Sequence, residues 1–156
     1  LPTDKRLSKN EFVLMDFGAE YNRYASDITR TFIFGKANNK MKEIYETVLD
    51  AQMRSIDMIK AGVNGRDVDK LARSIIDKKF KEKFIHSLGH EVGLSVHDGN
   101  RLSSQVDFIL KENMVVTVEP GVYIPEIGGV RIEDTVLVTR GRPKILTDFS
   151  KKLSEI

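Results

Sequence analysis

Residues 12–34 read FVLMDFGAEYNRYASDITRTFIF, in which two runs of β-branched and aromatic residues flank a polar centre. This pattern predicts a β-hairpin. Each run carries one aspartate, Asp16 or Asp27, among residues that favour burial. If Tyr21 and Asn22 form a two-residue turn, antiparallel pairing places Asp16 directly opposite Asp27 on one face of the hairpin.

These two aspartates need a positive charge between them. The Cβ atoms of directly opposed residues lie about 5 Å apart, and two carboxylates at that distance repel each other. Arg30 lies in the second run, but the alternation of side chains along a strand places it on the opposite face. A bound metal ion is therefore the better candidate.

The composition is that of a globular domain. A chain of 156 residues is long enough to bury a sizeable core. With 31% charged residues and a net charge of +2, nothing favours nucleic acid or an anionic membrane as a partner. The sequence contains no apolar run of about 20 residues and no signal peptide, so we expect a cytoplasmic protein. Since cysteine is absent, any metal must be bound by oxygen and imidazole ligands.

Two amphipathic helices are expected after the hairpin. Apolar residues recur at three- and four-residue steps over residues 40–60, which predicts the first helix. The second is expected over residues 66–80, with Asn64 or Gly65 near its N-cap. Residues 140–153 are expected to form a short strand and a closing helical turn.

A second pair of strands is expected over residues 114–124 and 129–138. Each valine-rich run is interrupted by a glutamate, Glu119 in the first and Glu133 in the second. The turn between the runs centres either on Glu126 or on the glycines that follow it. Both registers bring the two glutamates within a few residues of each other.

All three histidines lie in one short segment, at His86, His90 and His97. A single histidine is most often a hydrogen-bonded structural residue. Here Gly89 and Gly93 lie beside them, where the backbone can approach a ligand closely, and this favours a binding site. The first two have the spacing of a helical zinc pair, but serine follows His86 where a His-Glu-x-x-His protease needs glutamate, so a mononuclear zinc-protease site is disfavoured.

Four carboxylates and one imidazole form the candidate ligand set: Asp16, Asp27, His90, Glu119 and Glu133. For either glutamate, the simplest alternative is an ion pair with Arg131 or exposure at a sheet edge. Gathered together, the set carries about four negative charges, which two divalent cations would cancel. Oxygen ligands with one histidine suit Mn, Co, Zn or Fe. Two such ions about 3.5–4 Å apart can activate a bridging hydroxide and polarise a carbonyl group, as in metal-assisted hydrolysis.

Five motifs resemble the pita-bread metallopeptidases, a family that includes methionine aminopeptidase, aminopeptidase P and prolidase. They are DFGA at 16–19, SDITRT at 26–31, LGHEVGLSVH at 88–97, TVEPGVY at 117–123 and GGVRIED at 128–134. The motifs occur in the family's order and extend over almost the whole chain. The resemblance implies the α+β pita-bread (creatinase/aminopeptidase) fold, a curved antiparallel sheet with covering helices.

The same resemblance sets an expectation for domain organisation. Leu1 is not a start methionine, and the chain opens just before a strand. Compared with the family, the first N-terminal portion of the fold and a separate N-terminal domain are missing. We therefore expect residues 1–156 to be the C-terminal catalytic domain, incomplete at its N-terminus, of an enzyme that is a homodimer when full length.

The resemblance assigns a role to each metal ligand. Asp16 would chelate one divalent ion, and Asp27 and Glu133 would bridge both ions. His90 and Glu119 would complete the second site. The family's ligands thus coincide with the set chosen from the residues alone, and two divalent ions are the implied cofactors.

The resemblance also implies the substrate. Glu119 would act as the general base, His97 would stabilise the substrate carbonyl as it becomes tetrahedral, and His86 would line the substrate pocket. His86 and Arg131, both substrate-binding by resemblance, distinguish the proline-directed branch from methionine aminopeptidases. The expected activity is hydrolysis of Xaa-Pro peptides, either as an aminopeptidase P or as a prolidase (Xaa-Pro dipeptidase).

Two alternatives come from related pita-bread proteins. One is a metal-free module that binds peptides without catalysis, and the other is a creatinase-like hydrolase that works without metal. Both are disfavoured because such proteins lack metal ligands that this sequence retains.

Overall fold

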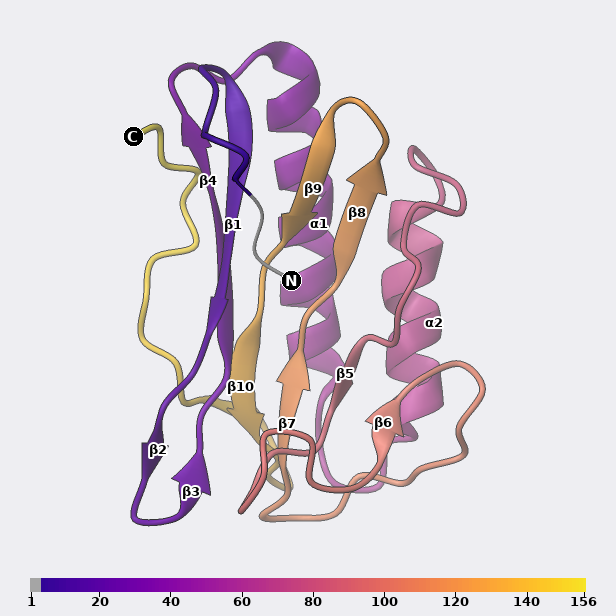
Figure 1. The fold of residues 1–156 in the computed structure, drawn as a ribbon. Coiled ribbons are helices and arrows are strands. Elements are labelled where there is room, and N and C mark those ends of the chain that lie inside the picture. The colour runs from indigo at the N-terminus through magenta and orange to yellow at the C-terminus, as the bar shows by residue number, and fades with distance from the viewer. Residues whose placement is uncertain (1–3) are drawn as a thin grey trace.

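The computed structural model describes residues 4–156, which contain eleven strands and two helices. Figure 1 shows their arrangement. The N-terminal strands are β1 Glu11–Phe17, β2 Glu20–Tyr21, β3 Tyr24–Ala25 and β4 Ile28–Phe34. The helices are α1 Asn39–Met58 and α2 Gly65–Ile76, followed by β5 Gly89–His90 and β6 Arg101–Leu102. The last strands are β7 Val115–Val118, β8 Gly121–Ile124, β9 Gly128–Arg131, β10 Asp134–Leu137 and β11 Lys144–Ile145.

The first hairpin is present, but its register differs from the predicted one. Its turn centres on Asn22 and Arg23, whose φ angles are 50° and 70°. Positive φ at both central residues is what a type I′ hairpin turn requires. As a result Asp16 lies opposite Thr29, and the prediction that it lies opposite Asp27 was wrong. Because Asp27 is two residues before Thr29, its side chain still shares the face of Asp16.

Both predicted helices are confirmed, with small differences at their ends. Helix α1 begins after Asn38, whose side chain accepts a hydrogen bond from the amide of Met41 at 2.9 Å. Helix α2 has Asn64 as its N-cap. It ends at Ile76, four residues earlier than predicted, although Phe80 remains buried in the turn that follows.

Each of the later predicted strands is divided in two at its glutamate. Glu119 and Pro120 separate β7 from β8, and proline lacks the N–H that would continue the ladder. Glu133 lies in the break between β9 and β10. The turn centres on Glu126, with a φ of 70°. The β7–β10 and β8–β9 ladders share one register, so Glu119 lies across from Glu133.

The C-terminal segment is extended where a helical turn was predicted. After β11, the chain runs along β4, where the amide of Ile33 donates to Ser154 O at 3.0 Å and the amide of Ile156 donates to Ile33 O at 2.8 Å. These bonds satisfy backbone groups of β4 that would otherwise lie at a sheet edge. The helical prediction failed because this long-range pairing dominates over local preference.

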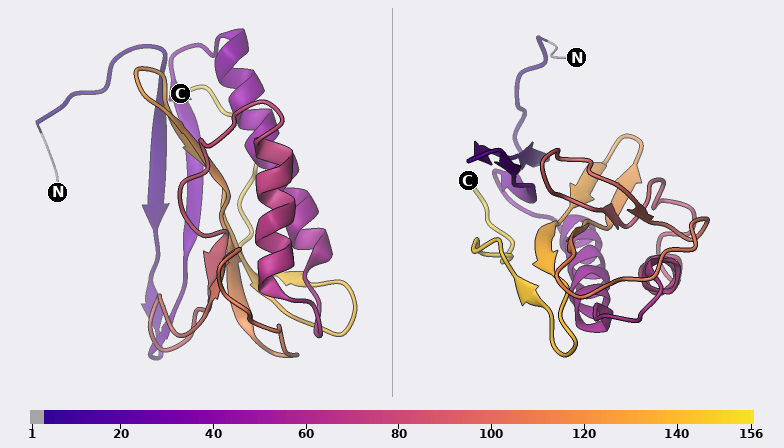
Figure 2. Two further views of the ribbon diagram at one scale, coloured as in Figure 1. Left: turned by 90° about the vertical axis from the view of Figure 1, so that its right-hand side faces the viewer. Right: turned by 90° about the horizontal axis from the view of Figure 1, so that it is seen from below.

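The hydrophobic core lies between the two helices and the strands β7 to β10, and Figure 2 shows both helices on the same side of the strands. On the other side, β1 lies against β9. The amide of Glu133, in the break between β9 and β10, donates to Thr29 O near the start of β4 at 3.1 Å, and β5 lies against β7, so these segments meet at one junction. No helix within residues 4–156 has the length and apolarity needed to span a bilayer.

Candidate metal centre

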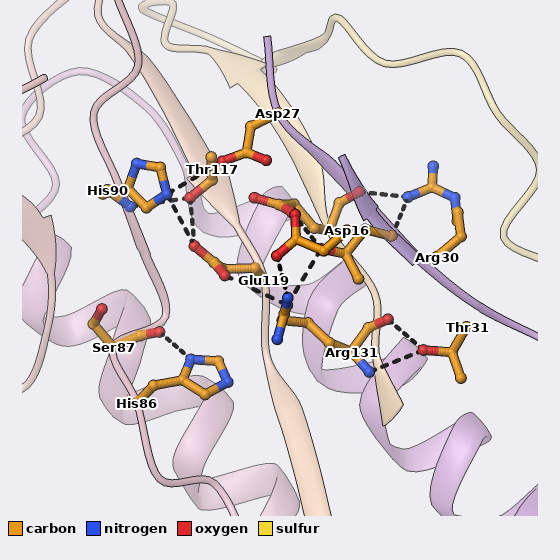
Figure 3. A network of polar contacts seen from close by, with 12 residues as sticks. Asp16, Asp27, Arg30, Thr31, His86, Ser87, His90, Thr117, Glu119 and Arg131 are labelled. Carbon is orange, nitrogen blue, oxygen red and sulfur yellow. Dashed lines mark hydrogen bonds and ion pairs between the residues drawn. The ribbon is translucent and has the colours of Figure 1, made fainter. Parts of the chain in front are cut away.

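Three side chains from distant segments converge at this junction. Asp27, just before β4, His90 in β5 and Glu133 between β9 and β10 each offer one ligand atom, and these atoms lie within 4.8 Å of one another. All three residues are buried. Glu119 joins them, with its Oε1 atom 3.2 Å from His90 Nε2 (Figure 3).

His90 is oriented as a metal ligand would be. Its Nδ1 atom lies 3.1 Å from the carbonyl oxygen of Glu91, which can only accept, so Nδ1 carries a proton and Nε2 faces the carboxylates. Burial lowers the pKa of His90, but hydrogen bonds with Asp27 and Glu119 outweigh it and raise the pKa to about 10. Without a metal ion, a protonated His90 thus supplies positive charge to the cluster.

The side chain of Glu133 has one buried oxygen without a partner. It is 1% exposed, and its Oε2 atom accepts a hydrogen bond from Thr29 Oγ1 at 2.6 Å, whereas Oε1 has no hydrogen-bond partner among the described residues. Burial, followed by the charge of Glu119, raises the pKa of Glu133 to about 8. An unpaired buried carboxylate oxygen beside other carboxylates is what a divalent cation would need, so the residues of this cluster fit a metal site.

Asp16 lies at the rim of the cluster, with a side chain 47% exposed. It accepts a hydrogen bond from Arg131 Nη2, and Arg131 Nε lies 3.7 Å from Glu119 Oε2. The predicted alternative of an ion pair with Arg131 is therefore present in part. Arg131 and the protonated His90 together supply two positive charges to a cluster of four carboxyl groups, and Glu133 makes no ion pair with Arg131 among the described residues.

Arg30 lies on the opposite face from the carboxylates, as the alternation of the strand predicts. Its Nη2 atom is 2.8 Å from Asp134 Oδ1, and its Nη1 atom donates to the carbonyl oxygens of Thr29 and Glu133. Arg30 therefore holds the backbone of two strands at the point from which Glu133 projects.

The other two histidines lie beside the cluster and line a cavity of about 350 Å³, whose walls are His86, Ser87, His90, His97, Arg101, Glu119 and Arg131. The ring centroids of His97 and His90 lie 4.1 Å apart. His86 Nε2 lies 2.8 Å from the hydroxyl group of Tyr123, which in turn accepts from Arg131 Nη1 at 3.0 Å. Burial lowers the pKa of His86, which favours its neutral form.

A second cavity, of about 560 Å³, borders the cluster from the side of the first hairpin, with both Asp16 and Asp27 in its wall. Exposed apolar side chains, Leu94 and Val96, line the same cavity. The acidic cluster therefore lies between two cavities.

Sequence reasoning missed Arg101 and Tyr123, although both contact or face the site. Tyr123 lies within a motif that had been singled out, and its alternation with Glu119 along the β7–β8 run was the available signal. Arg101 lies opposite His90 in the β5–β6 pair. No local sequence pattern predicts that pairing, because each of the two strands has only two residues.

The chain matches metallopeptidase family M24 over residues 1–140. It belongs to this family. The M24 chain is 49% identical over 152 residues to an Xaa-Pro dipeptidase of Pyrococcus furiosus, covering 97% of its own length and 44% of that relative. It therefore spans less than half of the curated relative it matches.

Solved structures agree with this assignment. An Xaa-Pro dipeptidase from Bacillus anthracis superimposes on the M24 chain with a TM-score of 0.95 at 46% identity, covering 99% of this chain and 44% of that one. An X-Pro aminopeptidase from Thermotoga maritima gives a TM-score of 0.95 at 40% identity, with the same coverage of 99% and 44%. The predicted α+β pita-bread fold is confirmed.

Proposed function

We propose that the protein carrying this chain is a metallopeptidase that hydrolyses the bond between an N-terminal residue and proline. The observation that carries the proposal is the junction of the buried Asp27, His90 and Glu133 with the half-buried Glu119. One Glu133 oxygen there has no hydrogen-bond partner among the described residues. Relatives named Xaa-Pro dipeptidase and X-Pro aminopeptidase support the choice of substrate.

The proposed metal ligands are Asp16, Asp27, His90, Glu119 and Glu133. Their oxygen and imidazole donors suit two divalent ions of Mn, Co, Zn or Fe. When bound, these ions would lower the pKa of water and polarise the scissile carbonyl group. Asp16 would have to exchange its hydrogen bond with Arg131 for a metal ion, which its exposed position at the rim permits.

Glu119 is the proposed general base. Its Oε1 atom accepts from Thr117 Oγ1 at 3.0 Å and lies near His90, so the carboxylate is held at the wall of the cavity where the substrate would bind. Glu119 would take a proton from the attacking water and return it to the proline nitrogen as the peptide bond breaks. The carboxylate is regenerated by that transfer.

The substrate is assigned to the cavity beside Glu119. His97 would donate a hydrogen bond to the carbonyl oxygen as negative charge develops on it. His86 and Arg131, joined through the hydroxyl of Tyr123, would bind the part of the peptide that carries proline. Their connection limits movement of both side chains and so favours a single bound orientation.

Metal removal tests the proposal directly. The purified protein is stripped of metal, reloaded with Mn or Co, and assayed on a dipeptide and a tripeptide with proline in second place, with alanine in second place as the control. We expect metal-dependent cleavage of the proline peptides only. If the protein binds no metal and neither ion produces cleavage, the proposal fails, and a metal-free peptide-binding module becomes the better explanation of the fold.

A further inference from the structure

Next to the segment that carries His86, helix α2 has an ion pair that the proposed chemistry does not use, between a buried aspartate and an arginine whose side chain is 29% exposed. Asp69 is 0% exposed, and Arg73 follows it one helical turn later. Arg73 Nε lies 2.7 Å from Asp69 Oδ2, and Arg73 Nη2 lies 3.1 Å from Asp69 Oδ1. Neither residue reaches the acidic cluster.

Both side chains form hydrogen bonds with the backbone of the segment that carries His86. Arg73 donates from Nη1 to the carbonyl oxygen of Phe84 at 2.7 Å and from Nη2 to that of His86. Its guanidinium carbon lies 4.4 Å from the centre of the Phe84 ring. Asp69 accepts from the amide of Leu88 at 3.0 Å and from that of Ser104, also at 3.0 Å. One ion pair thus fixes the backbone on both sides of His86 and reaches the chain that follows β6.

These bonds continue to the residues of the cavity. The amide of Glu119 donates to the carbonyl oxygen of Leu88 at 2.8 Å, so Asp69 is connected to Glu119 through one residue. His86 Nδ1 lies 2.8 Å from the carbonyl oxygen of Ser87, which can only accept, so the ring presents Nε2 to Tyr123. The hydroxyl of Tyr123 can donate to Nε2 while it accepts from Arg131.

We propose that Arg73 and Asp69 are positioning residues that hold His86 in the orientation needed to bind substrate. A planar guanidinium group can bond two carbonyl oxygens and a carboxylate at once, and a lysine ammonium group cannot reproduce that fork. Ion pairs with one partner in solvent contribute little to stability, and those taken out of water commonly stabilise a fold no better than apolar residues of similar volume. The contribution of this ion pair is to fix the position of the segment that carries His86. The expected effect on substrate binding rests on the proposed function.

Arg73→Lys is the test, with Arg54→Lys as its matched control. Arg54 also pairs with an aspartate four residues earlier, Asp50, at 2.8 Å, but on the exposed surface of α1 and without a hydrogen bond to a backbone carbonyl in the described part of the chain. We expect Arg73→Lys to raise KM for an Xaa-Pro dipeptide about tenfold, with a smaller change in kcat and unchanged metal content. Arg54→Lys should leave KM unchanged. Equal KM values for both variants, or loss of metal in Arg73→Lys, would overturn the proposal.

A second readout does not depend on activity. Long-range ¹H–¹⁵N spectra report the tautomer of individual imidazole rings, and the His86 signals are assigned as those lost in His86→Gln. In the unaltered protein His86 should show a single neutral tautomer with its proton on Nδ1. Arg73→Lys should average the two His86 tautomers and leave the His90 signals in place. If no Xaa-Pro peptide is cleaved, the proposed function fails, and this spectrum still decides the role of Arg73: unchanged His86 signals would refute it.

Asp69→Asn covers the case in which Arg73→Lys does not fold. The asparagine is isosteric and keeps one acceptor oxygen, so it removes the charge and one hydrogen-bond acceptor without creating a cavity. We expect the same change in the His86 spectrum and a rise in KM smaller than about tenfold. A spectrum and a KM identical to those of the unaltered protein would count against the proposal.

Discussion

Glu119 Oε1 lies 3.2 Å from His90 Nε2, although His90 lies in β5 and Glu119 follows β7, 29 positions later in the sequence. The contact depends on the close approach of β5 to β7, where the His90 amide donates to Thr117 Oγ1 at 3.0 Å. The same hydroxyl donates to Glu119 Oε1 at 3.0 Å. A single threonine hydroxyl therefore contacts both the backbone of His90 and the side chain of Glu119.

Replacing Glu119 should abolish turnover and leave the fold intact. In Glu119→Ala no carboxylate remains to move the proton of the attacking water, so kcat should fall by at least about 10²-fold. His90→Ala should also eliminate turnover, because it removes the imidazole donor from the cluster. Peptide hydrolysis and circular dichroism provide the measurements. Glu112→Ala, at an exposed glutamate paired with Arg140, serves as the control. Near-normal cleavage by either site variant would refute the assigned roles.

Metal affinity should rise with pH. In the metal-free protein the pKa of Glu133 is raised to about 8 and that of His90 to about 10, so both residues hold protons at neutral pH. A metal ion must displace these protons. For each proton released, the apparent metal affinity rises about tenfold per pH unit as long as the pH is below the pKa of that group. Calorimetry in buffers of different ionisation enthalpy measures the release. Binding that is independent of pH from 6 to about 8 would contradict this expectation.

The pH dependence of folding follows from the same two groups. Both folded-state pKa values lie above the ordinary values of 4.5 for Glu133 and 6.5 for His90. Their contribution to the stability of the metal-free protein is therefore complete below those ordinary values and is lost as pH rises through about 8 and then about 10. Thermal melts with and without metal should consequently diverge as pH increases. A difference between the two melting temperatures that stays constant with pH would argue against this contribution of Glu133 and His90.

The sequence indicated the four carboxylate candidates because each interrupts a run of apolar residues, and it indicated His90 because the three histidines gather beside two glycines. Asp27 and Glu133 are examples, since both interrupt β-rich runs and both prove to be buried. It could not fix the hairpin register, which depends on the positive φ angles adopted by Asn22 and Arg23. Nor could it place Arg73, whose partners are backbone carbonyl groups that carry no signature in the sequence.

Asp134 should be one of the residues on which stability depends most strongly. Its carboxylate is completely buried and bonds Arg30, Lys151, Gln52 and Thr147. Burial raises the pKa of Asp134, but hydrogen bonds from Lys151, Thr147 and Arg30 outweigh it and lower the pKa below its ordinary value, so the group is ionised at neutral pH. Asp134→Ala leaves the buried guanidinium of Arg30 without its carboxylate and should cost about 3–5 kcal/mol.

Urea denaturation of the metal-free protein measures that loss without reference to activity. The matched control is Asp50→Ala, which removes a carboxylate from an exposed pair with Arg54. Its effect should be small, because exposed ion pairs contribute little to stability. If the two variants unfolded at the same urea concentration, the network around Asp134 would contribute no more to stability than the exposed pair of Asp50 and Arg54.

Gly89 should be required for the metal centre even though it offers no ligand. A Cβ atom at this position would lie 2.0 Å from the carbonyl oxygen of Thr117, a backbone atom that cannot move without shifting β7. Gly89→Ala should therefore separate β5 from β7, withdraw His90 from Glu119 and lower metal affinity by at least about tenfold. Gly141→Ala is the control, since no atom lies within 4 Å of its added Cβ. Metal titration distinguishes the two variants, and equal affinities would show that the close approach of β5 to β7 does not position the ligands.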